Sequence, residues 1–164
     1  MSRHVWSWGL GMLMLVLGMG NLGIMASPPL STAVVERVVD GDTLRVIMDG
    51  QSELVRLIGV DTPESKPNQK AIRDARRQGI PLKAVIRSGI VATQFTQQQV
   101  KPGDTIRLAY DRQERDRYHR LLAYVYTDNG KMLNATLLEH GMATPMPIAP
   151  NTRYRAWFAS LHKP

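Results

Sequence analysis

The sequence predicts an α+β fold that is mainly β, a five-stranded barrel with about three helices. Five segments have the composition of strands, one long helical segment separates the third from the fourth, and two shorter helical segments follow the fifth. That order is typical of an OB-type barrel, a class whose members commonly bind oligonucleotides on one face. Because a fold does not establish a function, the activity has to be argued from individual residues.

The first three predicted strands form a meander. Residues 34–39 are rich in β-branched side chains, residues 43–48 alternate in part, and residues 53–60 return as the third strand. Between the second and third lies Asp49-Gly50, a pair that favours a two-residue hairpin. These segments should therefore lie side by side in an antiparallel sheet.

The middle of the chain is polar first and then helical. Residues 65–83 are basic and interrupted by Pro67, Gly79 and Pro81, which predicts a loop with a short helical turn. Residues 82–100 favour a helix. Its expected apolar stripe consists of Val85, Ile86, Ile90, Val91 and Phe95.

The last third completes the predicted fold. Residues 105–110 and 121–126 are the fourth and fifth strands, and residues 132–140 are a helix that Gly141 ends. A proline-rich stretch at 145–150 then leads into a short terminal helix near 154–162.

The N-terminal 26 residues are predicted to be an export signal. Arg3 and His4 precede an uncharged stretch with an apolar centre, and small residues come just before two prolines. The alternative is an uncleaved membrane anchor, since residues 6–25 just reach the about 20 residues that a membrane span needs. Either alternative places a single domain, residues 27–164, outside the cytoplasm: secreted or periplasmic if the signal is cleaved, anchored and facing outward if it is retained.

Composition narrows the possible partners and chemistries. The chain carries 21 Lys and Arg against 14 Asp and Glu, for a net charge of +7. Such an excess favours polyanionic partners such as nucleic acid or anionic lipid, although it also fits a merely soluble surface. There are no cysteines, which excludes disulfides, thiol catalysis and zinc–thiolate sites.

Acidic residues gather where two neighbouring predicted strands begin and end. Asp40 and Asp42 flank Gly41 before the second strand, and Asp61 and Glu64 follow the third. Carboxylates that meet at one place repel one another unless a cation lies between them, and hard divalent ions prefer oxygen ligands. Taken one at a time, these acids could instead be ordinary turn and cap residues.

Two arginines accompany the acids. Arg56 lies in the third predicted strand, and Arg120 comes just before the fifth. Guanidinium groups bind phosphate through paired hydrogen bonds and stabilise charge that develops on it. Carboxylates, a metal ion and two arginines together indicate phosphoryl-transfer chemistry.

Several blocks of sequence resemble the staphylococcal-nuclease (thermonuclease) family. Three carry its signature: Val-Asp-Gly-Asp-Thr at 39–43, Arg-Leu through Val-Asp-Thr-Pro-Glu at 56–64, and Asp-Arg-Tyr-His-Arg at 116–120. The similarity continues at 92–96 and 134–143, so that it covers residues 34–143. Blocks in this order are far more specific than any one of them.

The resemblance implies a metal site. Asp42 and Asp61 match the carboxylates that ligate calcium in the family, and Thr62 matches a residue that ligates through its backbone carbonyl. The implied cofactor is Ca²⁺, although Mg²⁺ or Mn²⁺ also takes oxygen ligands.

The resemblance also implies catalytic and substrate-binding roles. Arg56 and Arg120 match the arginines that clamp the phosphate, and Glu64 matches the general base that polarises the attacking water. Arg117 and Tyr118 match residues that hold a terminal phosphate. In-line attack by water is expected to leave 3′-phosphates from DNA and RNA alike, and the expected state is a monomer with no protein partner.

Two features depart from the family pattern. His119 stands where the family usually has glycine, and the segment 144–150 lacks the tyrosines with which the type member packs on the substrate base. Two other functions stay open at this point. One is a non-catalytic nucleic-acid-binding module, and the other is a membrane-tethered protein that retains its N-terminal segment.

Overall fold

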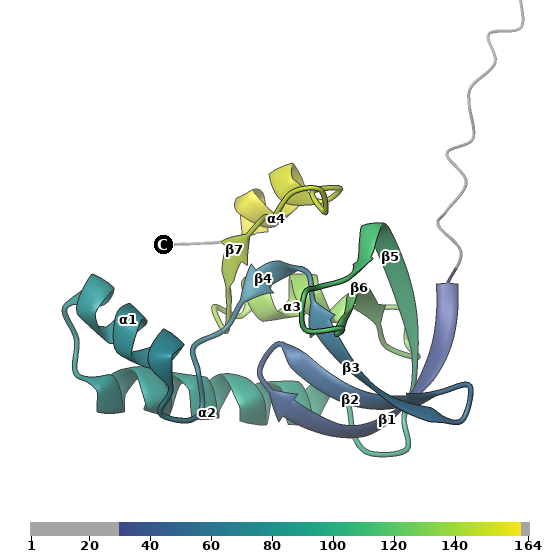
Figure 1. The fold of residues 1–164 in the computed structure, drawn as a ribbon, viewed down its shortest axis with the longest axis horizontal. Helices are drawn as coiled ribbons and strands as arrows, with labels where there is room; N and C mark the ends of the chain where they lie inside the picture. The colour runs from purple at the N-terminus through teal and green to yellow at the C-terminus, as the bar shows by residue number, and fades with distance from the viewer. Residues whose placement is uncertain (1–29, 162–164) are drawn as a thin grey trace, which may run out of the picture.

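A closed five-stranded barrel forms the body of the molecule (Figure 1). The computed structural model describes residues 30–161, so the predicted export signal at 1–26 lies outside the described part. Around the barrel the strands follow one another as β1 (Leu30–Asp40), β2 (Thr43–Met48), β3 (Gln51–Leu57), β6 (Leu121–Tyr126) and β5 (Thr105–Arg115). The predicted α+β, mainly β, barrel is confirmed.

The first strand is long enough to close the barrel by itself. Residues 30–34 of β1 pair with β5, whereas residues 34–40 pair with β2, both antiparallel. The β1–β2 register shifts at two places, where the strand bends. On the opposite side β3 and β6 run parallel, with Arg56 opposite Leu122.

The predicted hairpin between β2 and β3 is confirmed. Asp49 and Gly50 both have positive φ, at 51° and 77°. Turns of that hand match the twist of the flanking strands, so this pair fixes the register in which Thr43 faces Arg56.

The predicted third strand is interrupted. β3 ends at Leu57, and a separate strand β4 (Gly59–Asp61) pairs with β7 (Thr144–Met146) in a two-stranded sheet beside the barrel. Gly59 has φ 80°, and a Cβ there would lie 2.7 Å from the Phe158 ring. A glycine therefore turns the chain out of the barrel and carries Asp61 to a different sheet.

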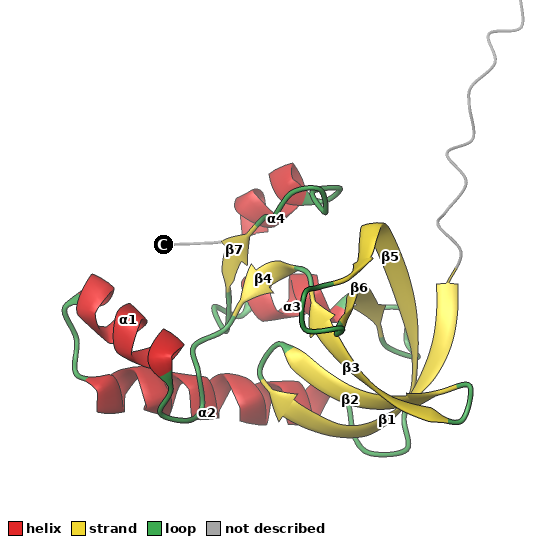
Figure 2. Cartoon of the chain, in the orientation of Figure 1, coloured by secondary structure: helices red, strands yellow, loops and turns green. Residues whose placement is uncertain are grey.

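The expected loop at 65–83 contains a full helix, so that prediction was wrong. The helix α1 (Gln69–Gln78) is capped by the Asn68 side chain, which accepts from Ala71 N–H, and ends at Gly79 with φ 65°. Ala71 and Ala75 pack on Val85 of α2 (Leu82–Gln99) in a small separate core. Figure 2 shows α1 alongside one end of α2, to the side of the barrel.

The helix α2 is confirmed, but its buried face matches the predicted one only in part. Ile90 and Val91, assigned to the apolar stripe, are 44% and 46% exposed. Val85 is buried as predicted, and Ile86 and Phe95 are partly buried, whereas the other buried positions are the unpredicted Gly89, Ala92 and Thr96. Small residues fill this face because the helix crosses the chain at Glu64 so closely that a Cβ on Gly89 would overlap the Glu64 carbonyl.

Two short helices complete the described chain, giving four helices where about three were expected. They are α3 (Leu133–Glu139) and α4 (Arg155–Leu161). The buried Asn134 in α3 ties the barrel to β4, since its amide donates to Ile58 O at 2.9 Å and accepts from Val125 N–H at 2.9 Å. None of the helices between residues 30 and 161 is long and apolar enough to cross a membrane.

Candidate active site

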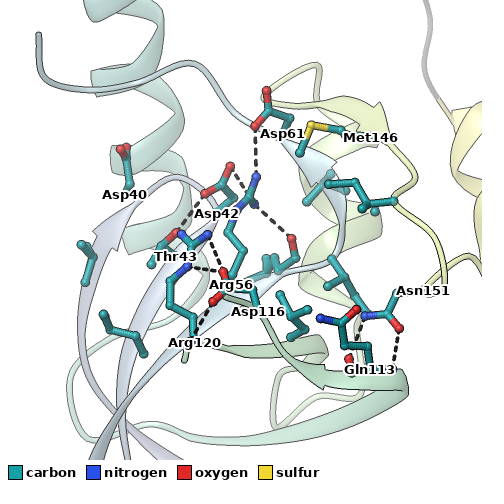
Figure 3. Close-up of a pocket in the computed structure, with 18 of the residues that line it drawn as sticks. Asp40, Asp42, Thr43, Arg56, Asp61, Gln113, Asp116, Arg120, Met146 and Asn151 are labelled. Atoms are coloured by element: carbon teal, nitrogen blue, oxygen red, sulfur yellow. Dashed lines mark hydrogen bonds and ion pairs between the residues drawn. The ribbon is translucent and has the colours of Figure 1, made fainter. Parts of the chain in front are cut away.

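A cleft of about 540 Å³ opens at the end of the barrel where β1 ends and β2 begins (Figure 3). Its lining includes residues of β3, β4 and the start of α1, and the segment 146–151, whose first residue Met146 pairs with Gly59 of β4. Five of the predicted site residues line it: Asp42, Arg56, Asp61, Glu64 and Arg120. Residues separated by up to 78 positions in the sequence therefore meet in one cavity.

Asp42 is the most firmly held carboxylate of the site. Its Oδ2 accepts from Thr62 N–H at 2.8 Å and from Thr62 Oγ1–H at 2.9 Å, and Oδ1 accepts from Thr43 Oγ1–H at 3.0 Å. Gly41 makes this approach possible, because a Cβ there would lie 2.8 Å from Thr62 Oγ1. The Asp-Gly-Asp turn thus fixes Asp42 against the end of β4.

Arg56 bridges the two predicted metal-binding carboxylates. Its Nη1 lies 2.8 Å from Asp42 Oδ2, and its Nη2 lies 3.0 Å from Asp61 Oδ1. A further hydrogen bond from Nη1 to Leu57 O, at 3.0 Å, orients the guanidinium plane. The side chain is 12% exposed, so these contacts hold it in one position at the wall of the cleft.

Lys70 lies at the centre of a second group of oxygens. Its Nζ is 3.2 Å from Asp61 Oδ2, 3.2 Å from Glu64 Oε1 and 3.3 Å from Asp74 Oδ2. It also donates to the Thr62 carbonyl at 3.1 Å. Asp61 is therefore shared between two protein cations, one on each carboxylate oxygen.

The pKa values in this group reflect burial and charge together. Burial raises the pKa of the Asp61 carboxyl, and nearby Asp42 adds to that shift, although Lys70 and Arg56 oppose it. Burial alone would lower the pKa of Lys70, but the Asp61 and Glu64 carboxylates outweigh it and raise that pKa. The raised pKa favours the charged ammonium, which these acids hold in place.

Arg120 is positioned by an acid four residues earlier in the chain. Its Nε donates to Asp116 Oδ2 at 2.8 Å, and its Nη2 lies 2.7 Å from the same oxygen. Asp116 Oδ1 also accepts from the Tyr118 and Arg120 N–H groups, at 2.9 and 3.0 Å. His119, at the position expected to be glycine, takes φ 62°, so the turn keeps the left-handed residue that it needs.

Arg117 and Tyr118 lie outside the cleft lining, on the turn beside it. Tyr118 is 62% exposed, and its hydroxyl accepts from Arg117 Nη2 at 2.7 Å. The Arg120 guanidinium carbon lies 5.6 Å from the centre of the Tyr118 ring. The two residues therefore stand at the rim, next to a residue that lines the cleft.

The segment 146–151 contributes apolar groups to the cleft and is attached to β5. Met146 and Ile148 contribute to the lining, in the segment where the family's type member carries tyrosines. The buried Asn151 fastens this segment to β5, since it accepts from Gln113 N–H and donates to Gln113 O, both at 2.8 Å. Aliphatic and thioether groups thus take the place of an aromatic platform.

The donor chemistry around Asp42, Asp61 and Thr62 fits a hard divalent cation. Arg56 contacts the Asp42 and Asp61 carboxylates, Lys70 contacts Asp61 and the Thr62 carbonyl, and all of these ligand atoms are oxygens. Within residues 30–161 no three or more His, Cys, Asp or Glu side chains converge as a ready metal cage. The oxygens that would bind a metal are instead engaged by Arg56 and Lys70.

Comparison with known proteins agrees with this geometry. The family model described as "Staphylococcal nuclease homologue" matches residues 54–163, about two thirds of the chain. The chain belongs to the staphylococcal nuclease family.

Curated members of the staphylococcal nuclease family match most of the chain. A thermonuclease of Staphylococcus intermedius is 41% identical over 123 residues, and one of Staphylococcus hyicus is 39% identical over 125. These matches cover 74% and 76% of the chain but 64% of each relative. Endonuclease YncB of Bacillus subtilis is 36% identical over 76% of the chain and 53% of its own length. The chain thus spans somewhat less than two thirds of these relatives.

Three residues of this family member's site were not singled out from the sequence. Lys70 and Asp74 were hidden in the basic stretch that was taken for a loop, and Asp116 was quoted only as part of a motif. A signal for the first two existed, because Asn68 and Gly79 are typical helix-capping residues and place both side chains on one face of a helix.

Proposed function

We propose that this protein is an exported, metal-dependent endonuclease that hydrolyses phosphodiester bonds of DNA and RNA. The observation that carries the proposal is that Arg56, Glu64 and Arg120 line one cleft beside the Asp42 and Asp61 carboxylates. Two guanidinium groups can neutralise a phosphodiester while a carboxylate acts on water. The names of the relatives, thermonuclease and endonuclease, support the same chemistry.

Arg56 is suited to clamp the scissile phosphate because its orientation is already fixed. Three of its N–H groups meet Asp42, Asp61 and the Leu57 carbonyl, so in the described part of the chain two of the five remain for a ligand. A preorganised donor needs no reorientation as charge develops on the phosphoryl oxygens.

Arg120, in the turn just before β6, offers the second clamp. Asp116 holds its Nε and Nη2 edge, which leaves the Nη1 side for a phosphate oxygen. Because Asp116 is fixed in turn by two backbone N–H groups, the arginine is placed by the hairpin rather than by its own flexible stem.

Glu64 is proposed to accept a proton from the attacking water. In this structure its Oε2 accepts from Asn68 Nδ2 at 2.6 Å and its Oε1 lies 3.2 Å from Lys70 Nζ, so its carboxylate is held in one orientation at the cleft. As the water oxygen bonds to phosphorus, the bond from phosphorus to the 5′ oxygen breaks and that oxygen takes up a proton. The products are a 3′-phosphate and a 5′-hydroxyl.

Asp42, Asp61 and the Thr62 carbonyl are the residues that would hold the divalent ion, with Ca²⁺ as the expected cofactor. When bound there, such an ion supplies Lewis-acid polarisation and neutralises developing negative charge. Arg117 and Tyr118, at the rim, are proposed to contact a terminal phosphate of the substrate. The enzyme is proposed to act as a monomer on nucleic acid.

Cleavage assays with Glu64→Gln test the catalytic assignment. The full-length protein is incubated with single-stranded DNA, duplex DNA and RNA, with Ca²⁺ or with chelator. Loss of the base should lower the rate by about 10²–10⁴-fold, and Arg56→Lys and Arg120→Lys should each lower it by about 10²–10³-fold. Chelator should abolish cleavage by the wild type.

The matched control is Glu139→Gln, an exposed glutamate on α3 away from the cleft, which should leave the rate unchanged. Binding without cutting under Ca²⁺, Mg²⁺ and Mn²⁺ would overturn the proposal in favour of a non-catalytic binding module. Cleavage that persists in Glu64→Gln would overturn the role of that residue alone.

Export is proposed from the N-terminal 26 residues. Their basic start, apolar centre and small-residue exit support a cleaved signal, with a retained anchor as the alternative. The mass of the protein recovered from the producing cells separates the two: removal of about 26 residues indicates secretion, and an intact N-terminus in the membrane fraction indicates anchoring.

A further inference from the structure

The Lys70 ammonium takes the kind of coordination that a metal ion would take. Four oxygens surround Nζ at 3.1–3.3 Å: three carboxylate oxygens and one backbone carbonyl. Two of them belong to Asp61 and Thr62, the residues expected to hold the divalent ion, and a third belongs to Glu64. Lys70 therefore binds the same oxygens that the cofactor needs.

The position of Lys70 on α1 is unfavourable for a positive charge. Lys70 is the second residue of α1, where a positive charge opposes the helix dipole. Its position is therefore determined by the surrounding acids and not by the helix dipole. Only one of these acids, Asp74, lies on α1, one turn after Lys70.

The Lys70 side chain can move away from the carboxylates without unfolding α1. It is 28% exposed, so a path to solvent is open. The helix is anchored independently, through the Asn68 cap and through Ala71 and Ala75 against Val85. A flexible four-carbon stem can thus withdraw while the helix stays in place.

We propose that Lys70 is a tethered cation that competes with the divalent ion for Asp61 and the Thr62 carbonyl, and so sets the metal affinity of the site. The inference rests on the proposed metal-dependent function. Without metal, Lys70 neutralises the carboxylates and keeps Glu64 in place. On metal binding, the ammonium withdraws from Asp61 and Thr62.

Calorimetric titration of Ca²⁺ into the full-length protein tests the competition. Lys70→Met keeps the length of the side chain and removes its charge, so its dissociation constant for Ca²⁺ should fall at least about tenfold, since a like charge near the ion is removed. Lys70→Arg keeps the charge and should not tighten binding. The matched control is Lys83→Met, an exposed lysine on α2 that takes no part in the cleft lining.

A purely structural role for Lys70 predicts the opposite sign. If the lysine only braces Glu64 and Asp74, its loss loosens the site and Ca²⁺ affinity falls or stays unchanged, and either result overturns the inference. Wild-type binding with no tightening in Lys70→Met overturns the inference alone. Absence of Ca²⁺, Mg²⁺ and Mn²⁺ binding in both proteins overturns the inference and the proposed metal dependence together.

A measurement on the wild type avoids dependence on folding of the variant. In ¹H–¹⁵N spectra of lysine side chains, an ammonium held by several oxygens exchanges its protons slowly enough to be seen. The Lys70 Nζ signal, assigned by its absence in Lys70→Arg, should be present with chelator and shift or disappear as Ca²⁺ is added. An unchanged signal at saturating Ca²⁺ would overturn the proposal.

Discussion

Asp116 lines the cleft beside Arg120 and determines where Arg120 can act. One carboxylate receives two backbone N–H groups and two side-chain nitrogens of Arg120. Burial would raise the pKa of Asp116, but the Arg120 side chain and the two N–H groups outweigh it and hold the pKa below its ordinary value.

Asp116→Asn should therefore show a stability loss that depends on pH. A group with a lowered folded pKa stabilises the fold above its unfolded pKa, and that contribution is lost as the pH falls through the folded value. Near neutral pH the variant should melt about 2–4 °C lower, as expected for about 1 kcal/mol. Below about pH 3.9 the two melting temperatures should converge.

Thermal melts of both proteins between neutral pH and about pH 3 check this expectation. A difference that stays constant over the whole range would contradict it, because the charge of Asp116 would then contribute nothing.

Most of the candidate site was predictable from the sequence at the level of single residues. Asp42, Arg56, Asp61, Glu64 and Arg120 do lie in one cleft, because each sits at or near the end of a predicted strand. Lys70 was missed although the capping residues of α1 could have placed it. Asp116 was not predictable, since its role depends on the geometry of the turn that it closes.

At the scale of elements, the contact between α2 and the chain at Glu64 is the closest in the site. The Gly89 backbone leaves no room for a methyl group beside the Glu64 carbonyl. The same helix contacts the Asp-Gly-Asp turn, since Thr96 Oγ1 donates to Gly41 O at 2.7 Å and Thr93 Oγ1 to Asp40 Oδ1 at 2.9 Å. One helix thus supports both acidic segments.

Gly89→Ala should lower activity although alanine is the better helix former. In a solvent-exposed helix the change would stabilise by up to about 1 kcal/mol. Here the added methyl must displace the Glu64 backbone, so cleavage should fall by about 10²-fold, the size expected for a misplacement near 1 Å. Packing strain should destabilise the fold by about 1–3 kcal/mol.

Ser88→Ala is the matched control, because Ser88 is the exposed neighbour on the same helix. Cleavage rates and denaturant melts should show a loss of activity and stability in Gly89→Ala and no such loss in Ser88→Ala. Equal behaviour of the two proteins would mean that α2 does not position Glu64.

The helix α1 and the stripe on α2 show why element prediction was incomplete. Proline and a run of basic residues obscured the caps of α1, whose buried face is only Ala71, Asp74 and Ala75. On α2 the larger apolar residues were expected inside, but close approach to the chain at Glu64 selects small side chains there. Apolar periodicity reports burial poorly wherever backbones nearly touch.

For the whole molecule, the barrel was predictable because its strands are continuous and adjacent hairpins fix their order. The β4–β7 sheet was not, since it joins residues more than eighty positions apart through two strands of three residues each. Three residues show too little alternation of apolar and polar side chains to predict a strand. The pairing of these strands also depends on Gly59 and on the packing of α4.

Overall charge leads to a prediction about nucleic-acid binding. With a net charge of +7, affinity should fall steeply with salt, by about a hundredfold between roughly 50 and 200 mM if about four phosphates are neutralised. Fluorescence anisotropy with Glu64→Gln, which should bind without cutting, measures this slope. Salt-independent binding would contradict an electrostatic interface.

The basic side chains around α1 have two alternative interpretations, a solvated surface or a contact with nucleic acid. Arg73 and Arg76 are exposed on that helix. If they touch the substrate, Arg73→Gln with Arg76→Gln should reduce the salt slope by about two, since each lost phosphate contact removes close to one. An unchanged slope assigns them to the solvated surface.

The strand β1 runs from the start of the described chain, at one end of the barrel, to the cleft at the other end. Leu30 pairs with Ala109 at one end, and Asp40 lines the cleft at the other. At about 3.3 Å per residue, the ten steps between them span at most roughly 33 Å. A resin, a particle or a lipid layer joined ahead of Leu30 would therefore leave the cleft free, so the molecule is well shaped for use as an immobilised reagent.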